Sequence, residues 1–396
     1  MQEKIIRIPD EEFKERVVKI QQKMIEEGYD YLLCFGNEAE PQFVRYFSDY
    51  WPSFETAGVL IPREGKAKLL IGPETFTYAN DRSRIKDIRL LKAFRESSEP
   101  EYPGKKLSTF SEVFEECMPG VKIKRFGVAG LPLLSVGIYH DLMDALKPFG
   151  DIKLEKADDL VAQLRMYKTE NELACMREAA RITRLTMDYV LENIKVGMTE
   201  TQVVGLALGK MHELGAERES YPLWVLTGDG SDQAISRPRQ KKIKKGDMTF
   251  LQIGARYEGY ASSIGRPVVF GKATEEQKRL IETGYQLQRE ILSMVKAGVP
   301  AKDVANFHLA KVKEYGYEDY YLYGPFHGNG LMEGEAPWVE TNSTYELEEN
   351  MTFCSDLFLG NHDKKVGIRI EDVVRITKDG CENLTAYPLK LFEIDR

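Results

Sequence analysis

The sequence contains few cysteines, and none of its apolar runs is long enough to cross a membrane. Its 5 cysteines among 396 residues are scattered and never in C-x-x-C spacing, which indicates neither a disulfide framework nor a zinc ribbon. The amino-terminal segment becomes charged before a signal-peptide apolar region begins, and no apolar run reaches the roughly 18 residues of a transmembrane helix. We therefore expect a cytoplasmic protein with reduced thiols and no membrane partner.

The sequence also lacks a concentration of positive charge. With 55 Lys and Arg against 63 Asp and Glu, the formal net charge is −8. Binding to nucleic acid or to an anionic membrane requires clustered Lys or Arg, and the one dense basic stretch, residues 237–247, is short and leads into an apolar strand. We interpret this stretch as a solvated turn, and expect a small-molecule substrate and no nucleic-acid partner.

The first 157 residues show the pattern of an α/β layer domain. Apolar residues at helical spacing precede Gly28, a residue type that often ends helices. Short apolar segments between polar turns predict strands at residues 31–35, 57–62, 67–72, 88–94, 124–130 and 151–157. Strands that alternate with helical segments indicate an α/β domain, and a chain of 396 residues is long enough for a second domain.

The pattern changes near residues 155–162, and we place the second domain at residues 158–396. Much of its first part is helical, and three of its predicted helices begin with a T-x-x-E/Q capping box, formed by Thr169 with Glu172, Thr199 with Gln202 and Thr274 with Gln277. The helices alternate with strand pairs that resemble hairpins, at residues 248–270 and 351–377. This arrangement is typical of an α+β domain.

Three segments of the second domain carry a family resemblance. They are KKGDMTFLQIGARYEGYASSIGR at 244–266, FHGNGLMEGEAPWVE at 326–340 and VGIRIEDVVRIT at 366–377. In this order, after a smaller α/β domain, they resemble the creatinase, prolidase and aminopeptidase P family, known as peptidase family M24. The resemblance covers essentially the whole chain and implies an α/β amino-terminal domain followed by an α+β catalytic domain of the pita-bread fold.

The resemblance also implies an altered metal site. Metal-dependent members of the family hold two divalent ions with five side chains, and the matching positions here are Gln252, Ser263, His327, Asp356 and Glu371. Two adjacent dications need bridging anions, yet the first two positions, which are Asp in those members, carry a neutral amide and a neutral hydroxyl. The resemblance therefore predicts a family member without a bimetallic centre.

The creatinases work without metal, but their pattern is also incomplete here. Their general-base His belongs to a loop that matches residues 228–240, which contain no His. Their guanidinium-binding Glu falls on Gly265. The second His of the peptidases' HE-x-P motif falls on Gly334, although Glu335 remains.

The remaining polar residues favour a creatinase-like hydrolase that cleaves a C–N bond of a small nitrogenous compound and needs no cofactor. In this prediction His327 moves the proton, Glu371 and Asp356 orient it or the attacking water, and Glu335 is a second acid or base. One alternative is a one-metal, Xaa-Pro peptidase-like hydrolase or lyase, in which His327, Asp356 and Glu371 hold one divalent ion. The other alternative is a non-catalytic binding protein.

The substrate-binding residues are predicted from their proximity to the motifs. Arg369 and Tyr260 are expected to stabilise a tetrahedral intermediate, while Phe326 and Trp338 are candidates for an apolar pocket wall. In many creatinase-like dimers an amino-terminal loop reaches the partner's active site, and the matching stretch here, residues 46–58, carries Glu55. The resemblance therefore implies a homodimer, and Glu55 would favour a substrate with a cationic end.

Overall fold

The computed structural model describes residues 6–117 and 122–396. The chain divides into two compact units, of which the smaller is Ile8–Arg165 and the larger contains Met166–Arg396. Helix α6 (Asp158–Arg165) belongs to the smaller unit, so the division follows Arg165 rather than residue 157. Within the described ranges, none of the helices is long and apolar enough to span a membrane.

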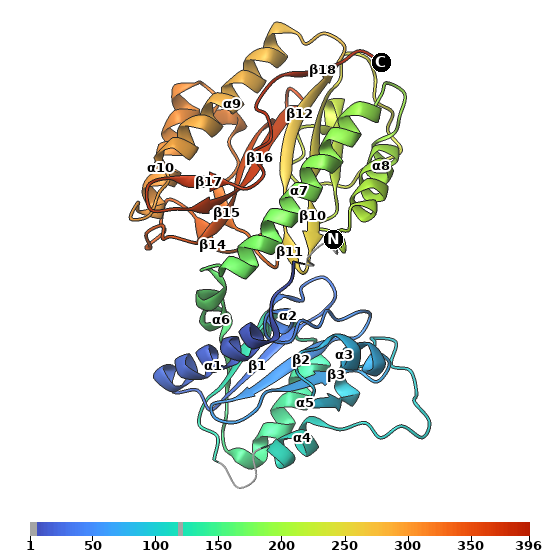
Figure 1. Ribbon diagram of the computed structural model, residues 1–396, viewed down its shortest axis with the longest axis vertical. Coiled ribbons are helices and arrows are strands. Elements are labelled where there is room, and N and C mark those ends of the chain that lie inside the picture. Colours follow the sequence, from blue (N-terminus) through green and yellow to red (C-terminus); the bar gives the residue numbers. More distant parts are fainter. Residues whose placement is uncertain (1–5, 118–121) are drawn as a thin grey trace, which may run out of the picture. The chain divides into compact units, whose positions relative to one another are not determined.

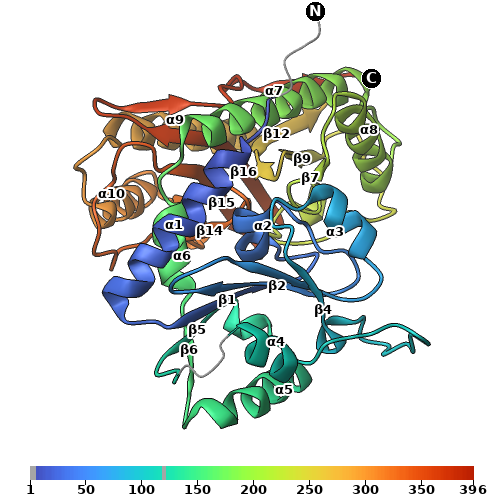
Figure 2. The ribbon, with the colours of Figure 1, turned by 60° about the horizontal axis from the view of Figure 1, so that its bottom comes forward.

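The smaller unit is built around a mixed six-stranded sheet, in the order β4-β3-β2-β1-β5-β6. Its strands are β1 (Tyr31–Gly36), β2 (Ala57–Pro62), β3 (Lys68–Ile71), β4 (Ile88–Leu90), β5 (Phe126–Ala129) and β6 (Leu154–Lys156). Its helices are α1 (Asp10–Glu27), α2 (Gln42–Ser48), α3 (Phe76–Arg82), α4 (Phe110–Cys117), α5 (Val136–Leu146) and α6. Figure 2 shows α1 and α2 on one side of this sheet and α4 and α5 on the other. The α/β class expected for this segment is confirmed.

Helix α1 illustrates why the local predictions succeed here. It buries Phe13, Ile20 and Met24 along one face, the spacing that produces an amphipathic helix. It ends at Gly28, whose φ of 79° is left-handed, a conformation that glycine adopts without steric cost.

The larger unit contains a nine-stranded sheet, in which β14-β13-β15-β16-β12-β9-β8 are neighbours, β17 pairs with β16 and β18 pairs with β12. The strands are β8 (Trp224–Thr227), β9 (Met248–Ile253), β12 (Ile264–Phe270), β13 (Phe326–Gly328), β14 (Glu335–Val339), β15 (Thr352–Asn361), β16 (Val366–Ile376), β17 (Cys381–Asn383) and β18 (Phe392–Ile394). A small second sheet contains β7 (Arg218–Glu219), β10 (Ala255–Tyr257) and β11 (Tyr260–Ala261). The helices are α7 (Glu170–Asn193), α8 (Glu200–Glu213), α9 (Glu275–Met294) and α10 (Ala301–Glu314).

All three capping boxes form as the sequence predicts. Thr169, Thr199 and Thr274 each accept a hydrogen bond from the third helical residue, whose own side chain bonds back to the cap. Each box satisfies two backbone donors that a helix start would otherwise leave unpaired. The starts of α7, α8 and α9 are thereby fixed by the sequence alone.

The segment at residues 248–270 is more divided than the expected strand pair. Between β9 and β12 the chain forms an additional hairpin of β10 and β11. Its turn lies at Glu258 and Gly259, which have φ values of 47° and 87°, the positive angles that a tight hairpin turn requires. The hairpin carries the chain out of the main sheet and returns it at Ser263.

One face of the main sheet packs against the helices, and the other carries polar side chains. Along β16, Ile368 and Ile370 join the core with α9 and α10, so Arg369 and Glu371 point to the opposite face. Along β9, Leu251 and Ile253 likewise join the core that contains α7 and α8 residues. Figure 1 shows the two helix pairs flanking the strands. The face opposite these cores therefore collects the polar side chains of several strands.

Candidate functional site

Strand register brings four predicted positions into one row across the sheet. Gln252 of β9 pairs with Gly265 of β12, which pairs with Glu371 of β16, which in turn pairs with Asp356 of β15. Residues directly opposite one another in neighbouring strands share a face. The row therefore places an amide and two carboxylates side by side, although more than a hundred residues separate the first from the last.

A second row adds a histidine and a cysteine. Cys354 precedes Asp356 by two residues on β15 and so lies on the same face, and it pairs with His327 of β13. His327 Nδ1 lies 3.1 Å from the Gly328 carbonyl oxygen, so the tautomer that donates this hydrogen bond leaves Nε2 free of a proton. Trp338 covers the imidazole, with ring centroids 5.2 Å apart.

Gln252 and Ser263, the two neutral residues at positions where a two-ion site would need carboxylates, belong to one hydrogen-bonded network. The Gln252 amide nitrogen donates to Ser263 Oγ at 3.0 Å and to a carboxylate oxygen of Glu371. The Tyr221 hydroxyl lies 2.9 Å from Ser263 Oγ. A side chain at Gly265 would collide with Gln252 Oε1, so glycine at this position makes room for the longer amide.

Asp356 is neutralised by Arg369 rather than exposed to the site as an unpaired carboxylate. Arg369 donates from Nε at 2.8 Å and from Nη2 at 2.7 Å, and Tyr323 donates its hydroxyl at 2.8 Å. Burial alone would raise the pKa of Asp356, but the Arg369 charge and its hydrogen bonds outweigh burial and lower that pKa. Asp356 therefore remains ionised and held in place.

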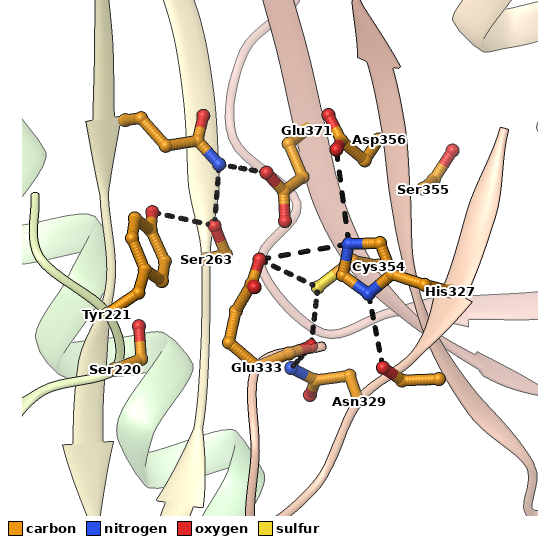
Figure 3. Close-up of polar contacts among 12 residues, drawn as sticks. Ser220, Tyr221, Ser263, His327, Asn329, Glu333, Cys354, Ser355, Asp356 and Glu371 are labelled. Carbon is orange, nitrogen blue, oxygen red and sulfur yellow. Dashed lines mark hydrogen bonds and ion pairs between the residues drawn. The ribbon is translucent and has the colours of Figure 1, made fainter. Parts of the chain in front are cut away.

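The centre of the site is a cluster of His327, Glu333, Cys354 and Glu371, which we call the HECE cluster. One ligand atom of each residue lies within 4.8 Å of the others. Figure 3 shows their side chains pointing toward one another. His327 Nε2 lies 3.9 Å from Glu333 Oε1 and 3.9 Å from Asp356 Oδ2, and Cys354 Sγ lies 3.7 Å from Glu333 Oε1.

The two glutamates of the HECE cluster repel one another's charge. Burial, followed by the charges of Glu333 and Asp356, raises the pKa of Glu371 well above its ordinary value. Burial also raises the pKa of Glu333. Like-charged carboxylates in a buried site oppose each other's ionisation, and the Arg369 charge acts in the other direction on both pKa values.

The remaining predicted site residues of the larger unit have contacts of their own. They are the catalytic candidate Glu335 and the binding candidates Tyr260, Phe326 and Trp338. The Glu335 carboxylate lies 3.4 Å from Lys168 Nζ and accepts the Met332 backbone N–H at 3.1 Å. Tyr260 donates its hydroxyl to Glu172 at 2.7 Å. Phe326 belongs to the apolar core around α9 and α10. Trp338 is 52% exposed and contacts His327, so it is the pocket-wall candidate that reaches the HECE cluster.

Glu55 is buried in the smaller unit, 2% exposed. Its carboxylate accepts the backbone N–H of Glu74 at 3.0 Å, and the N–H and hydroxyl of Thr75 at 3.1 and 2.7 Å. These contacts tie the loop before β2 to the start of α3. They account for the burial of Glu55, and its role toward a substrate stays a prediction.

Glu333 and Cys354 were not selected from the sequence, although each had a signal. Cys354 stands two residues before Asp356 in a predicted strand, and alternation places it on the same face. Glu333 stands two residues before Glu335, within the motif segment itself. The residue spacing was sufficient to nominate Cys354, whereas Glu333 lies between β13 and β14 and its direction depends on the loop path.

Two family models match the chain. The model described as metallopeptidase family M24 matches residues 174–378, and the creatinase/prolidase amino-terminal domain matches residues 16–167. The M24 match covers more than half of the chain, so the chain belongs to metallopeptidase family M24. The predicted pita-bread fold and the prediction of a hydrolase of the creatinase/prolidase family are thereby confirmed.

Individual relatives match most of the chain. The Xaa-Pro dipeptidase of Pyrococcus furiosus is 27% identical over 94% of this chain and 98% of its own length. The Xaa-Pro dipeptidase of Pyrococcus horikoshii is 29% identical over 76% of this chain and 82% of its own. Among solved structures, the X-Pro aminopeptidase of Thermotoga maritima has a TM-score of 0.82, with 27% identity and coverage of 96% of this chain and 99% of that one.

The side chains present do not fit the two-ion centre that the family implies. The amide of Gln252 and the hydroxyl of Ser263 are neutral and hydrogen-bonded to their neighbours. The guanidinium of Arg369 contacts both oxygens of Asp356. Two adjacent dications require several bridging anions, and a fixed positive charge beside one carboxylate opposes their binding.

Proposed function

We propose that this chain hydrolyses a C–N bond of a small nitrogenous compound at the HECE cluster, without a bimetallic centre. The observation that carries the proposal is the pairing of Asp356 with Arg369 beside the neutral Gln252 and Ser263. This arrangement removes the anions for a second ion and leaves imidazole and carboxyl groups in contact range. Such groups are the common acids and bases of enzymes.

The relatives indicate which compounds to test first. Two relatives that match this chain over most of their own length are Xaa-Pro dipeptidases. The bond that a dipeptidase cleaves is an amide C–N bond. Xaa-Pro dipeptides are therefore the first substrates, followed by small amides and guanidino compounds. The exposed Trp338 side chain beside His327 and the buried cluster behind it favour a small substrate over a protein.

The proposed reaction uses His327 as the group that moves the proton. Water attacks the carbonyl carbon while its proton passes to His327 Nε2, and the same proton then passes to the nitrogen as the C–N bond breaks. Glu333, 3.9 Å from Nε2, and Glu371 orient the water. Arg369 and Tyr260 already donate to Asp356 and Glu172, so we assign Arg369 to positioning. One of the Tyr221 and Ser263 hydroxyls donates to the other, and the hydroxyl whose proton stays free donates to the intermediate's oxygen.

Glu335 has a supporting part in this proposal. Its carboxylate is paired with Lys168 and accepts a hydrogen bond from the Met332 backbone, which fixes the loop that presents Glu333.

We also propose that the protein is a cytoplasmic homodimer. The cytoplasmic location is based on its unpaired thiols in the described residues, and the dimer on the family resemblance. Light scattering on the full chain tests the dimer.

The test is steady-state hydrolysis by the full chain, with His327→Ala, His327→Gln and, as a control, the exposed His362→Ala. We expect either His327 variant to lower kcat about 10²–10⁴-fold, the range typical of a lost acid or base, and the control to match the wild type. Unchanged turnover in both His327 variants would contradict the proposed role. An absence of turnover on every compound, with the fold intact, would favour a binding protein.

A further inference from the structure

We propose that Glu200, a buried carboxylate at the start of α8, is a positioning residue of the active site. It holds both ends of the loop formed by residues 228–238, and through that loop it places the Ala234 carbonyl against Arg369. The inference rests on the proposed function, because it assigns a part in that reaction to a residue outside the HECE cluster.

Glu200 is fully buried, and its carboxylate binds the chain on either side of the loop. One oxygen accepts the Thr227 backbone N–H at 2.9 Å, where β8 ends. The other accepts the Arg239 backbone N–H at 2.8 Å and the Arg239 Nε–H at 3.2 Å. A buried carboxylate needs such donors because it has lost its contacts with water. Glu200 therefore ties the two ends of the loop to one helix.

Arg239 also supports the first turn of the loop. A side chain at Gly230 would collide with Arg239 Nη2, so the guanidinium packs directly against the loop backbone. Lys241 adds contacts with the Thr227 carbonyl and the Asp229 carboxylate. The segment that follows the loop thus holds its beginning as well as its end.

The middle of the loop lies against two paired glycines. Gly360 of β15 pairs with Gly367 of β16, and a side chain at Gly367 would collide with the Ser231 carbonyl oxygen. A Cβ atom at Gly360 would lie 3.1 Å from the Asp232 carbonyl oxygen. The Gly367 backbone N–H donates to Ser231 Oγ at 3.2 Å. Because the paired residues have no side chains, the loop backbone can lie directly on the strands.

The loop reaches the active site at Ala234. Its carbonyl oxygen accepts a hydrogen bond from Arg369 Nη1 at 2.8 Å, while Nε and Nη2 of the same guanidinium hold Asp356. Asp356 Oδ2 lies 3.9 Å from His327 Nε2. A guanidinium is planar and its donors are fixed relative to one another, so the Ala234 carbonyl and the Asp356 carboxylate set its orientation together. Displacement of the loop therefore moves Arg369 and, with it, Asp356.

Trp224 makes the position of Arg369 measurable without a substrate. Its ring centroid lies 4.7 Å from Arg369 Cζ, so a moved guanidinium changes the environment of this indole. The chain has 3 tryptophans. The other two are Trp51, which belongs to the smaller unit, and Trp338, which lies beside His327.

The first measurement is fluorine nuclear magnetic resonance of the full chain labelled with fluorotryptophan, with signals assigned by Trp→Phe variants. We expect Glu200→Gln to shift the Trp224 signal, because an amide nitrogen cannot accept the Arg239 donors, and to leave the Trp51 signal in place. The control Glu213→Gln, exposed at the other end of α8, should leave every signal in place. An unmoved Trp224 signal in folded Glu200→Gln would overturn the inference.

The second measurement is kcat in a double-mutant cycle of Glu200→Gln and Arg369→Lys, which keeps a cation beside Asp356 but loses the Nη1 donor to Ala234. We expect Glu200→Gln alone to lower kcat about 10–100-fold, the effect of misplacing a catalytic group by up to about 1 Å, and Glu213→Gln to match the wild type. In the Arg369→Lys background, Glu200→Gln should lower kcat less than about 2-fold. Equal losses in both backgrounds would show that Glu200 does not act through Arg369.

Circular dichroism shows whether each variant folds. If Glu200→Gln does not, Arg239→Ala carries both measurements, because its side chain is 44% exposed and its removal releases the same end of the loop. The two proposals fail separately. A shifted Trp224 signal without hydrolysis of any compound contradicts only the proposed function, whereas hydrolysis by Glu200→Gln at the wild-type rate contradicts only the positioning role.

Discussion

Arg369 donates two parallel hydrogen bonds to the Asp356 carboxylate, from Nε at 2.8 Å and from Nη2 at 2.7 Å, and both side chains are buried. The pair stands at a position where the family's metal-dependent members place a ligand. Bidentate guanidinium–carboxylate pairs fix geometry as well as charge. The pair therefore forms a neutral, rigid wall of the site.

The first prediction concerns the coupling between these two residues. Asp356→Asn or Arg369→Met alone leaves one buried charge without its partner, which we expect to cost about 3–5 kcal/mol of unfolding free energy. The double variant should cost less than the sum of the two. Urea unfolding of the four proteins in a double-mutant cycle measures the difference. Additive effects would show that the pair contributes no coupling.

The second prediction concerns the amide of Gln252. Gln252→Glu replaces a donor to Glu371 and Ser263 with a group that only accepts, and brings another carboxylate against Glu371. We expect a loss of about 2–3 kcal/mol in the ion-free chain, from a buried polar contact left unmade. The matched control is Gln240→Glu, an exposed position in the same unit. Equal unfolding midpoints for the two variants would contradict the described network.

The third prediction is a pH dependence that arises from His308 of α10. His308 is 1% exposed, and burial lowers its pKa from 6.5 to about 4. The folded chain thus keeps His308 neutral where the unfolded chain protonates it. Stability from this group is present above pH 6.5 and is lost as the pH falls toward 4, by about 3 kcal/mol in total.

The measurement is the difference in unfolding free energy between wild type and His308→Phe across that pH range. The variant keeps a ring beside Tyr321, whose centroid lies 5.5 Å away, and cannot titrate. We expect the wild type to lose stability relative to the variant on acidification, while the exposed His140→Gln tracks the wild type. Parallel curves for wild type and His308→Phe would show that His308 protonates without cost in the folded chain.

The fourth prediction separates two roles of Glu55. Its three accepted hydrogen bonds imply that Glu55→Gln destabilises the smaller unit by about 1–3 kcal/mol, because an amide nitrogen cannot accept them. The exposed Glu64→Gln is the control. If the contacts describe its whole role, KM for a cationic substrate stays unchanged. A raised KM with an unchanged unfolding midpoint would instead support the predicted substrate contact.

The sequence was most informative where local chemistry decides the structure. The capping threonines, the C-cap Gly28 and the period-two alternation of Arg369 and Glu371 with Ile368 and Ile370 all depend on neighbours within a few residues. The order of the motif segments was enough for the pita-bread fold. These features required no knowledge of strand pairing.

Which residues meet in the site depends on the register of strand pairing, and the sequence alone does not give that register. Arg369 meets Asp356 because β15 and β16 pair in the register that sets Phe358 opposite Arg369, which brings the carboxylate within diagonal reach. Glu333 enters the site through the loop between β13 and β14, whose path depends on the surrounding packing. Asp356 was therefore predicted to orient the proton or the attacking water, or to hold an ion, without its arginine partner.

The most direct test of the central claim is metal content per chain, measured by plasma mass spectrometry on hydrolytically active protein after incubation with manganese, zinc and iron. The account predicts at most one ion per chain under every condition, because Gln252, Ser263 and the Asp356–Arg369 pair supply no ligands for a second. Two ions per chain, with activity that rises as the second binds, would contradict it.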